Sequence, residues 1–311
     1  MVELQRVRRY ERRGAKETLR FDRGPCQDTV RRARANLIAL SRDGKDADHK
    51  TGGPRYSLLA LRNPKAACAP ARSEIVFIPM VRSFISVPAL LDRLEAFHGQ
   101  QEAWWPVDPY EFIVWWNSGY PQSDTACAKG WEKLTAEIGI EVERLLVAPS
   151  AKLAGALKPG GMFPELRALR LKEIARRVQD ELGGDLRAAL AGPLANARKI
   201  LKRFPGIAEP GADRILLFAG IAPVAAVPSN CVHVLVRILR GKERDNYGAN
   251  YREAQEAIAL QVPETLEART RAYLLLKRHG QEICKRTKPK CDRCPLKSNC
   301  AFVSGKRVAQ G

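Results

Sequence analysis

The sequence predicts an all-α protein, because apolar residues recur every three or four positions along most of the chain after residue 80. The stretches VPALLDRLEAF and ELRALRLKEIARRVQDEL both follow this spacing. It is the periodicity of an amphipathic helix, whose turn takes 3.6 residues. Alternating strand patterns and hairpin turn signals are missing from the same part of the sequence. We therefore expect about nine or ten helices between residues 97 and 280, joined by short turns.

Two helix boundaries are marked clearly in the sequence. Asp108 comes directly before Pro109, and this pair is typical of a helix start, where the missing N–H of proline costs no hydrogen bond. Gly183 and Gly184 follow a long Arg-rich helical segment and predict its end. Helical periodicity and boundary signals thus agree on the fold class.

The length and charge of the chain limit the classes of protein to which it can belong. At 311 residues it is long enough for two folded lobes, and its formal net charge of +19 favours a polyanionic partner. The alternative is that the charge only keeps the protein in solution. No apolar run is long enough for a membrane span or a secretory signal, so we expect a cytoplasmic protein.

Residues 1–80 form a basic leader that we expect to be mostly disordered. Two short apolar pieces, YSLLAL and EIVFIP, could be strands but have no clear partner. The more regular pattern starts at Met80, so the leader is either an over-extended reading frame or a basic arm that follows nucleic acid. The sequence leaves both interpretations open.

A helix-hairpin-helix pattern is predicted where the tight turn FPGIA separates two helical segments. Gly206 lets the chain turn without a Cβ, and the second helix is expected to start near Glu209. Free amides at a helix start can bind phosphate. The turn therefore indicates contact with a nucleic-acid backbone, although a plain helix connection has the same form. Ala208 stands where such hairpins usually carry a second glycine.

The C-terminal segment CKRTKPKCDRCPLKSNC brings four cysteines into one basic loop with the spacing C-x6-C-x2-C-x5-C. Thiolates this close together are strong metal ligands. Structural zinc usually uses two separate ligand pairs, whereas one loop around all four corners suits a 4Fe-4S cluster. The expected ligands are Cys284, Cys291, Cys294 and Cys300.

The remaining four cysteines have no framework spacing and favour a reducing compartment over a disulfide scaffold. They are Cys26, Cys68, Cys127 and Cys231.

The segment HGQEICKRTKPKCDRCPLKSNC resembles the end of the endonuclease III branch of the helix-hairpin-helix DNA glycosylase superfamily. FPGIAEPGADRILLFAG resembles the hairpin of that family, and VPSNCVHVLVRILRG resembles the helix that follows it. The resemblance implies a six-helix barrel lobe at 108–222, with the hairpin at 204–208. It also implies an iron–sulfur cluster lobe built from 81–107 and 223–303, followed by a tail at 304–311. The implied partner is double-stranded DNA with a damaged or mismatched base, bound by a monomer.

The resemblance also predicts where a lysine and an aspartate should stand in a catalytic member of the family. Pro210 occupies the position of the lysine and Pro228 that of the aspartate. Base excision needs a carboxylate near the positive charge that develops on the sugar. Asp213, Glu209 and Asp124 are the candidates for a displaced carboxylate, although acidic residues in a first helical turn are also favoured by the helix dipole.

Residues expected to contact DNA lie in the hairpin and in the cysteine loop. A wedge that fills the gap left by a flipped base is expected at Tyr120 or Gln122, while Trp115 and Trp116 are expected in the core. Ser229 and Asn230 are expected to cap the helix that follows them. The expected DNA contacts are Lys202, Arg203, Pro205, Gly206, Ile207, Ala208, Lys288 and Lys290.

The sequence thus favours a DNA-binding N-glycosylase of the base-excision-repair type, monofunctional because the lysine is missing. The alternative is a catalytically silent relative that binds distorted DNA as a sensor or recruiter. The two hypotheses differ in whether another carboxylate takes the place of the missing aspartate.

Overall fold

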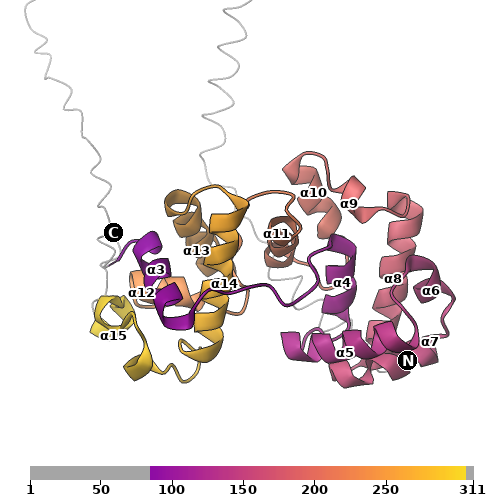
Figure 1. Ribbon diagram of the computed structural model, residues 1–311, viewed down its shortest axis with the longest axis horizontal. Coiled ribbons are helices and arrows are strands. Elements are labelled where there is room, and N and C mark those ends of the chain that lie inside the picture. The colour runs from indigo at the N-terminus through magenta and orange to yellow at the C-terminus, as the bar shows by residue number, and fades with distance from the viewer. Residues whose placement is uncertain (1–84, 306–311) are drawn as a thin grey trace, which may run out of the picture. The chain divides into compact units, whose positions relative to one another are not determined.

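The computed structural model describes residues 85–305, all of which belong to one compact unit, Ile75–Gly311. The predicted all-α class is confirmed, since the described residues form α-helices and short 3-10 helices and no strand (Figure 1). Two parts of the chain lie outside the described range. One is the predicted leader, which contains YSLLAL, EIVFIP, Cys26 and Cys68, and the other is the last six residues. No described helix is both long and apolar enough to cross a membrane.

The α-helices are α3 (Val87–His98), α4 (Pro109–Asn117), α5 (Asp124–Glu137), α6 (Val142–Val147), α7 (Ser150–Leu157), α8 (Pro164–Leu182), α9 (Leu186–Ala189), α10 (Leu194–Leu201), α11 (Glu209–Phe218), α12 (His233–Arg240), α13 (Tyr247–Gln261), α14 (Leu266–Glu282) and α15 (Ala301–Ser304). The 3-10 helices are η1 (Lys158–Gly160), η2 (Cys291–Arg293) and η3 (Lys297–Asn299). Eleven α-helices, α4 to α14, lie in the part of the described chain where about nine or ten are expected. The short α6 and α9 have too few residues for a clear periodic pattern.

The helix boundaries marked in the sequence are found in the structure. The Asp108 carboxylate caps α4 by accepting hydrogen bonds from the backbone amides of Tyr110 and Glu111. Gly183 ends α8 in the left-handed conformation, at φ 64°. These local signals therefore set the ends of the elements that surround the candidate site.

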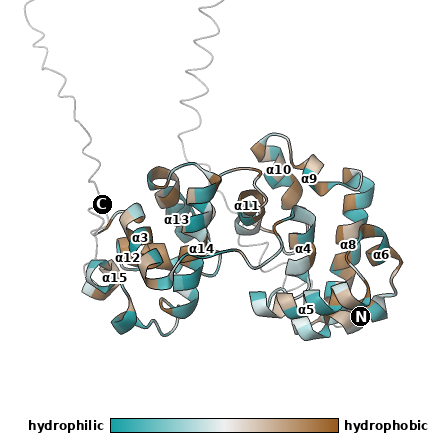
Figure 2. Ribbon diagram, viewed as in Figure 1, coloured by the Kyte–Doolittle hydropathy of each residue, from teal (hydrophilic) through white to brown (hydrophobic). Residues whose placement is uncertain are grey.

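A first hydrophobic core is built mainly from α4 to α11. Its largest fully buried side chains include Trp115 of α4, and α14 adds Tyr273 and Leu274 from the far end of the chain. Figure 2 shows hydrophilic and hydrophobic residues mixed along α8, as expected for a helix with one face toward a core. This core carries the hairpin on α10 and α11.

A second hydrophobic core joins α3 to the helices α12, α13 and α14. Leu296 and Cys300 of the cysteine loop also belong to it. On its surface Arg271 of α14 pairs with Asp92 and Glu95 of α3, and the Glu95 contact joins residues 176 positions apart. The cysteine loop is thus attached to a core that needs both ends of the described chain. The predicted residue limits of the two lobes and tails stay a prediction.

Asp213 connects the hairpin helices to α13. Its buried carboxylate accepts hydrogen bonds from Arg198 of α10 at 2.9 Å and from Tyr251 and Gln255 of α13 at 3.0 and 2.9 Å. The side chain is completely buried, so these partners replace the water that the charge would otherwise need. Asp213 is therefore a structural junction.

Candidate functional site

The predicted hairpin is a tight turn at 204–208 that is held by the end of α4. Trp116 donates its indole N–H to the Gly206 carbonyl at 3.1 Å, and the Asn117 amide donates to the Pro205 carbonyl at 3.1 Å. Gly206 has φ 74°, and a Cβ there would approach Tyr120 and Trp116 at 3.2 and 3.4 Å. Glycine is thus required both by the backbone conformation and by the close packing.

The hairpin residues named from the sequence do not all face outward. Gly206 and Ala208 are exposed, whereas Ile207 is only 6% exposed and packs in the first core. Lys202 is exposed and pairs with Glu209 at 2.7 Å, and Arg203 is exposed and pairs with Glu181 of α8. The outer surface of the turn therefore consists of backbone and small residues, and two basic side chains flank it.

A second loop lies beside the predicted wedge loop and is tied to it by Arg167. This arginine is 1% exposed and donates to the carbonyls of Ser118, Gly161 and Met162. Gly161 approaches Gln122 so closely that a Cβ would lie 2.9 Å from its Cγ. Loop 118–123 and loop 160–163 therefore form one buttressed edge next to the hairpin.

Met162 and Phe163 stand on this edge and were not predicted from the sequence. Both side chains are 55% exposed, and Phe163 is the one non-glycine residue of the described chain with a positive φ, at 59°. Holding a large aromatic residue in this conformation costs free energy, so surrounding contacts must compensate. The turn GGMFP in the sequence marks a loop, but it does not specify that the two side chains are exposed.

Tyr120 and Gln122 lie in the loop predicted to carry the wedge, and Tyr120 stacks on Trp116 with ring centroids 4.9 Å apart. Both side chains are half-buried. Trp115 is in the core as predicted, at 1% exposed. Trp116 is only partly buried, and its indole N–H contacts the hairpin.

Three of the four predicted ligand cysteines lie at the second core. Cys300 is buried in this core, and Cys284 and Cys294 pack against it. Burial raises the pKa of the Cys284 thiol to about 11, and the neighbouring Cys294 and Cys300 sulfurs also raise it. Cys291 acts on Cys294 in the same way. The Cys294 sulfur thus lies within electrostatic reach of each of the other three.

The donor set fits a thiolate-bound group by its chemistry, because four cysteines in one loop supply the soft sulfur ligands that such groups use. No group of three or more His, Cys, Asp or Glu side chains within residues 85–305 is arranged as a finished metal site. Any bound group would accordingly have to draw the four sulfurs closer together.

The backbone of the cysteine loop is held by side chains of α12. Arg237 donates to the carbonyls of Lys285 and Arg286 at 3.1 and 2.9 Å, and a ring nitrogen of His233 lies 2.6 Å from the Cys284 carbonyl. Lys288 and Lys290, predicted to contact DNA, are both exposed on this loop. The loop thus presents its cations from a fixed backbone.

The two prolines that the resemblance predicts at catalytic positions carry no amine or carboxylate. Pro210 is half-buried in the first turn of α11, and Pro228 is buried. The expectation that Ser229 and Asn230 cap the next helix is wrong. Helix α12 begins at His233 without a side-chain cap. Ser229 and Asn230 lie in the turn before it, where the Pro228 carbonyl accepts a hydrogen bond from the Cys231 amide.

Two of the three candidate carboxylates are engaged in other ways. Glu209 is half-exposed and pairs with Lys202 and, at 3.8 Å, with Arg198. Asp213 lies in the middle of α11, not in its first turn, and serves as the junction described above. Neither carboxylate is free to act on a substrate without breaking a structural contact.

Asp124 is the candidate carboxylate that is nearly buried and lies next to two basic side chains. It is the first residue of α5, its side chain is 10% exposed, and it pairs with Lys277 of α14 at 2.5 Å. Arg214 of α11 lies 3.6 Å from the same carboxylate oxygen. We call these three side chains the buried charge cluster.

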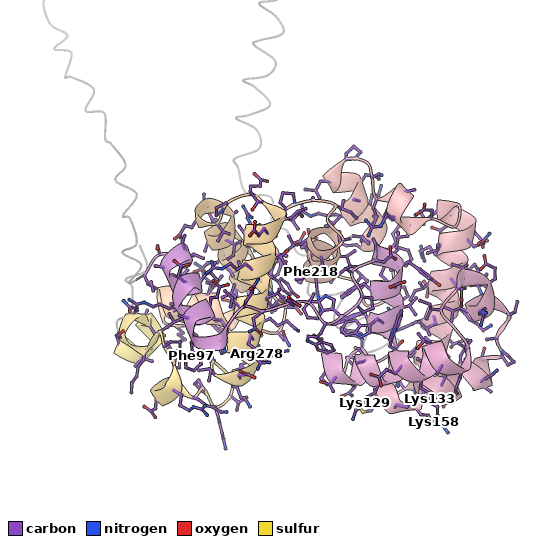
Figure 3. The ribbon with its side chains drawn as sticks, viewed as in Figure 1. Phe97, Lys129, Lys133, Lys158, Phe218 and Arg278 are labelled. Atoms are coloured by element: carbon purple, nitrogen blue, oxygen red, sulfur yellow. The ribbon has the colours of Figure 1, made fainter. Side chains whose placement is uncertain are left out.

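Aromatic rings enclose the buried charge cluster. The Arg214 guanidinium lies 4.0 Å from the Trp105 ring centroid, 4.7 Å from that of Phe112 and 5.8 Å from that of Tyr273. Phe218, labelled in Figure 3, packs edge-on against Trp105 and Tyr273. Burial lowers the pKa of Lys277, and the nearby Asp124 carboxylate opposes this shift. Lys277 and Arg214 were not predicted, because their contacts with Asp124 join distant helices.

Comparison with known proteins identifies relatives at low sequence identity, although no family model matches the chain. Endonuclease III of Thermotoga maritima is 25% identical over 196 residues, which cover 63% of this chain and 84% of the relative. A thymine/uracil-DNA glycosylase of Methanothermobacter thermautotrophicus is 27% identical over 161 residues, 51% of this chain and 67% of that protein.

Two solved structures share the fold. A thermostable thymine-DNA glycosylase matches with a TM-score of 0.56 and 22% identity, over 71% of this chain and 97% of its own. An endonuclease III in a non-covalent DNA complex also gives 0.56, with 18% identity over 70% and 95% of the two chains. The two structures show the fold, and together with the sequence relatives they support the endonuclease III-like helix-hairpin-helix DNA glycosylase superfamily for this chain.

Proposed function

We propose that this protein is a monofunctional DNA N-glycosylase of the base-excision-repair type, with Asp124 as the carboxylate that supports bond cleavage. Its substrate would be a damaged or mismatched base in double-stranded DNA, bound by a monomer in the cytoplasm or nucleoid. The single observation that carries the proposal is the position of Asp124, which contacts the second hairpin helix and α14. The relatives named above act on DNA by their own descriptions.

Several surfaces support DNA as the partner. The hairpin presents Gly206 and Ala208 between Lys202 and Arg203, and a backbone turn of this kind can approach a phosphate closely. The buttressed edge adds the exposed Met162 and Phe163, which have the apolar character of side chains that fill gaps between bases.

A further cationic surface lies on α5 and η1. Lys129 and Lys158 are exposed there, and Figure 3 shows them with Lys133 along the same side of the molecule. Lys133 also pairs with Glu137 at 3.6 Å, so its charge is partly compensated. Phosphate contacts of this kind position a duplex without reading its sequence.

Asp124 can supply the electrostatic support that base excision needs. Breaking the N-glycosidic bond leaves positive charge on the sugar, and a nearby carboxylate stabilises that charge in a site shielded from water. Such support is typically worth about 3–4 kcal/mol, or roughly a hundredfold to a thousandfold in rate. Because Pro210 has no amine, water would add to the sugar carbon and the strand would stay uncut.

We further propose that Cys284, Cys291, Cys294 and Cys300 hold a 4Fe-4S cluster. The gathered sulfurs and the backbone contacts from Arg237 and His233 support this assignment. A bound cluster would supply structural cross-linking and would fix the loop that carries Lys288 and Lys290. The residues of the loop would then present these charges to phosphates.

The second candidate function is a catalytically silent relative that binds distorted DNA as a sensor or recruiter. Two observations favour it. Pro228 is buried where the family places its aspartate, and Asp124 is already paired with two cations that weaken its field. This alternative and the enzyme differ in one measurable property, the release of a base.

Single-turnover base release on a panel of damaged and mismatched duplexes tests the proposal, with alkali treatment to reveal abasic sites. We expect release by the unaltered protein and a loss of roughly a hundredfold or more in Asp124→Asn. Glu209→Gln removes a carboxylate that lies outside the buried charge cluster and should retain the rate within about threefold. If only a Pro228→Asp variant releases a base, the protein is a silenced glycosylase and its role is binding.

A further inference from the structure

Three of the four histidines of the chain lie next to the cysteine loop. His233 contacts the Cys284 carbonyl, as described above. His279 of α14 places its Nε2 3.5 Å from the Cys294 sulfur, and its Nδ1 lies 3.1 Å from Nε2 of His98, the last residue of α3. Two imidazole rings in series thus connect α3 with a proposed ligand sulfur.

Both rings are shielded from water, so their nitrogens have to find partners within the protein. His279 is 0% exposed, and the side chain of His98 is 3% exposed. Phe97 packs edge-on against His98, with ring centroids 4.8 Å apart. A buried polar atom that stays unpaired is costly. The two contacts of His279 are therefore hydrogen bonds, and their direction follows from the chemistry of the partners.

The sulfur of a metal-bound cysteine fixes the direction of both hydrogen bonds. A thiolate ligand carries no proton and can only accept, so Nε2 of His279 has to carry the N–H that points to Cys294. A neutral imidazole has one N–H, which leaves Nδ1 of His279 as the acceptor for the Nε2–H of His98. His98 thus holds His279 in the tautomer that donates to sulfur.

Glu282 is a charged group that opposes this tautomer. Its carboxylate lies 3.7 Å from Nδ1 of His98 and would attract a proton to that nitrogen. The distance is too long for a hydrogen bond, and Arg278 engages the other oxygen of the same carboxylate at 2.8 Å. The Glu282 side chain is also 42% exposed, so water screens its charge. The hydrogen bond to an ionised sulfur is the stronger interaction and decides the tautomer.

We propose that His279 donates a hydrogen bond to the Cys294 sulfur and thereby raises the reduction potential of the bound cluster, with His98 as the residue that positions the donor. This inference rests on the 4Fe-4S cluster assigned under the proposed function, and it does not depend on base release. An N–H beside a ligand sulfur stabilises negative charge. Because an added electron makes the cluster more negative, the N–H favours the reduced form over the oxidised form.

Voltammetry of the cluster-loaded protein tests the donor. His279→Leu removes the N–H and should lower the reduction potential. We expect roughly a tenfold change in the equilibrium constant for reduction, which is about 59 mV for a one-electron couple. His279→Gln keeps an N–H on its side-chain amide and should recover part of the shift. Iron analysis shows whether each variant still carries about four irons per chain.

His98→Leu tests the positioning role, because it leaves His279 in place and removes only its partner. The potential should fall by less than in His279→Leu, since the N–H of His279 can then sit on either ring nitrogen. His98→Gln supplies a new donor and should restore the potential in part. Tyr247→Phe is the matched control, because it removes a neutral donor that contacts a backbone carbonyl, and its potential should equal that of the unaltered protein.

The outcomes separate the inference from the cluster itself. A His279→Leu protein with about four irons and an unchanged potential would overturn the inference and leave the cluster in place. If His279→Leu binds no iron, the His98→Leu variant decides, and an unchanged potential there would assign His279 as a metal ligand and overturn the donor role. A parent protein that holds zinc would overturn both. Base release is measured separately, so a failure of the glycosylase proposal changes none of these results.

Discussion

Two aspartates show how the same side chain takes different roles in this protein. Asp213 is completely buried and has three donors around it, which offset part of the cost of burial; burial still raises the pKa of its carboxyl. Asp124 is shared by two cations, and one of them keeps unpaired donors. Both aspartates are candidates from the sequence, but only their partners, which come from other helices, distinguish the structural carboxylate of Asp213 from the one that we propose to be catalytic.

Tyr251→Phe tests the structural role of Asp213. The change removes the hydroxyl that donates to the carboxylate at 3.0 Å and leaves a buried charge with one donor fewer. Burial and the neighbouring carboxylate raise the pKa of Tyr251, so the hydroxyl stays a donor at ordinary pH. We expect unfolding free energy to fall by about 1–3 kcal/mol in urea denaturation.

Tyr247→Phe is the control for that measurement. Its hydroxyl donates to the Ser229 carbonyl at 3.1 Å from a residue that is 44% exposed, so water can replace the bond. A cost of about 0.5 kcal/mol or less is expected. Equal losses of unfolding free energy in the two variants would mean that the hydrogen bond to Asp213 does not stabilise the protein more than an exposed one.

The elements themselves were predictable where their signals are local. The Asp108 cap, the Gly183 stop and the hairpin turn each depend on a few adjacent residues, and the structure contains all three. The buttressed edge was not predictable in the same way. It depends on Arg167 reaching carbonyls of a loop that lies 49 positions earlier in the chain, and no local pattern specifies such a contact.

Gly160→Ala tests this edge. A Cβ at residue 160 would overlap the Ser118 carbonyl and the Arg167 guanidinium, so the two loops would have to separate. We expect a loss of about 2–4 kcal/mol in stability and weaker duplex binding. Gly155→Ala is the matched control, since a Cβ inside α7 meets nothing within 4 Å.

That control should become more stable, by up to about 1 kcal/mol, because alanine is the better helix former. Thermal melting of the two variants side by side separates the results. A Gly160→Ala protein as stable as the parent would show that the loops are not held at that point.

At the scale of the whole molecule, the fold class and superfamily were predictable because they depend on periodicity and on motif order, both of which are visible in one sequence. The buried charge cluster was not, because its three residues come from α5, α11 and α14, which lie far apart in the sequence. Contacts between polar residues that are far apart in the chain produce no periodic pattern in the sequence. A catalytic site that departs from its family pattern therefore has to be found in the structure.

The proposed cluster should hold the second core together. Protein purified without oxygen should be brown and contain about four irons per chain, as four thiolate ligands imply. Cys291→Ser should lose the iron and the visible absorbance and should melt at a lower temperature, because ligand binding is coupled to the fold of the loop. The readouts are iron analysis, absorbance and thermal melting.

Cys127→Ala removes a buried cysteine of the first core and provides the control. It should keep its colour and its iron. A colourless parent protein with one zinc per chain would instead assign the loop to structural zinc and remove the iron–sulfur proposal.

The pairing of α3 with α14 also bears on how the chain is made. Helix α3 leaves the ribosome early, but the helices that cover it, α13 and α14, are synthesised last. Helices α4 to α11 can gather while α3 still has no partner. A newly made chain should thus carry an exposed apolar helix until translation is nearly finished, which makes α3 the segment on which a nascent-chain chaperone would act.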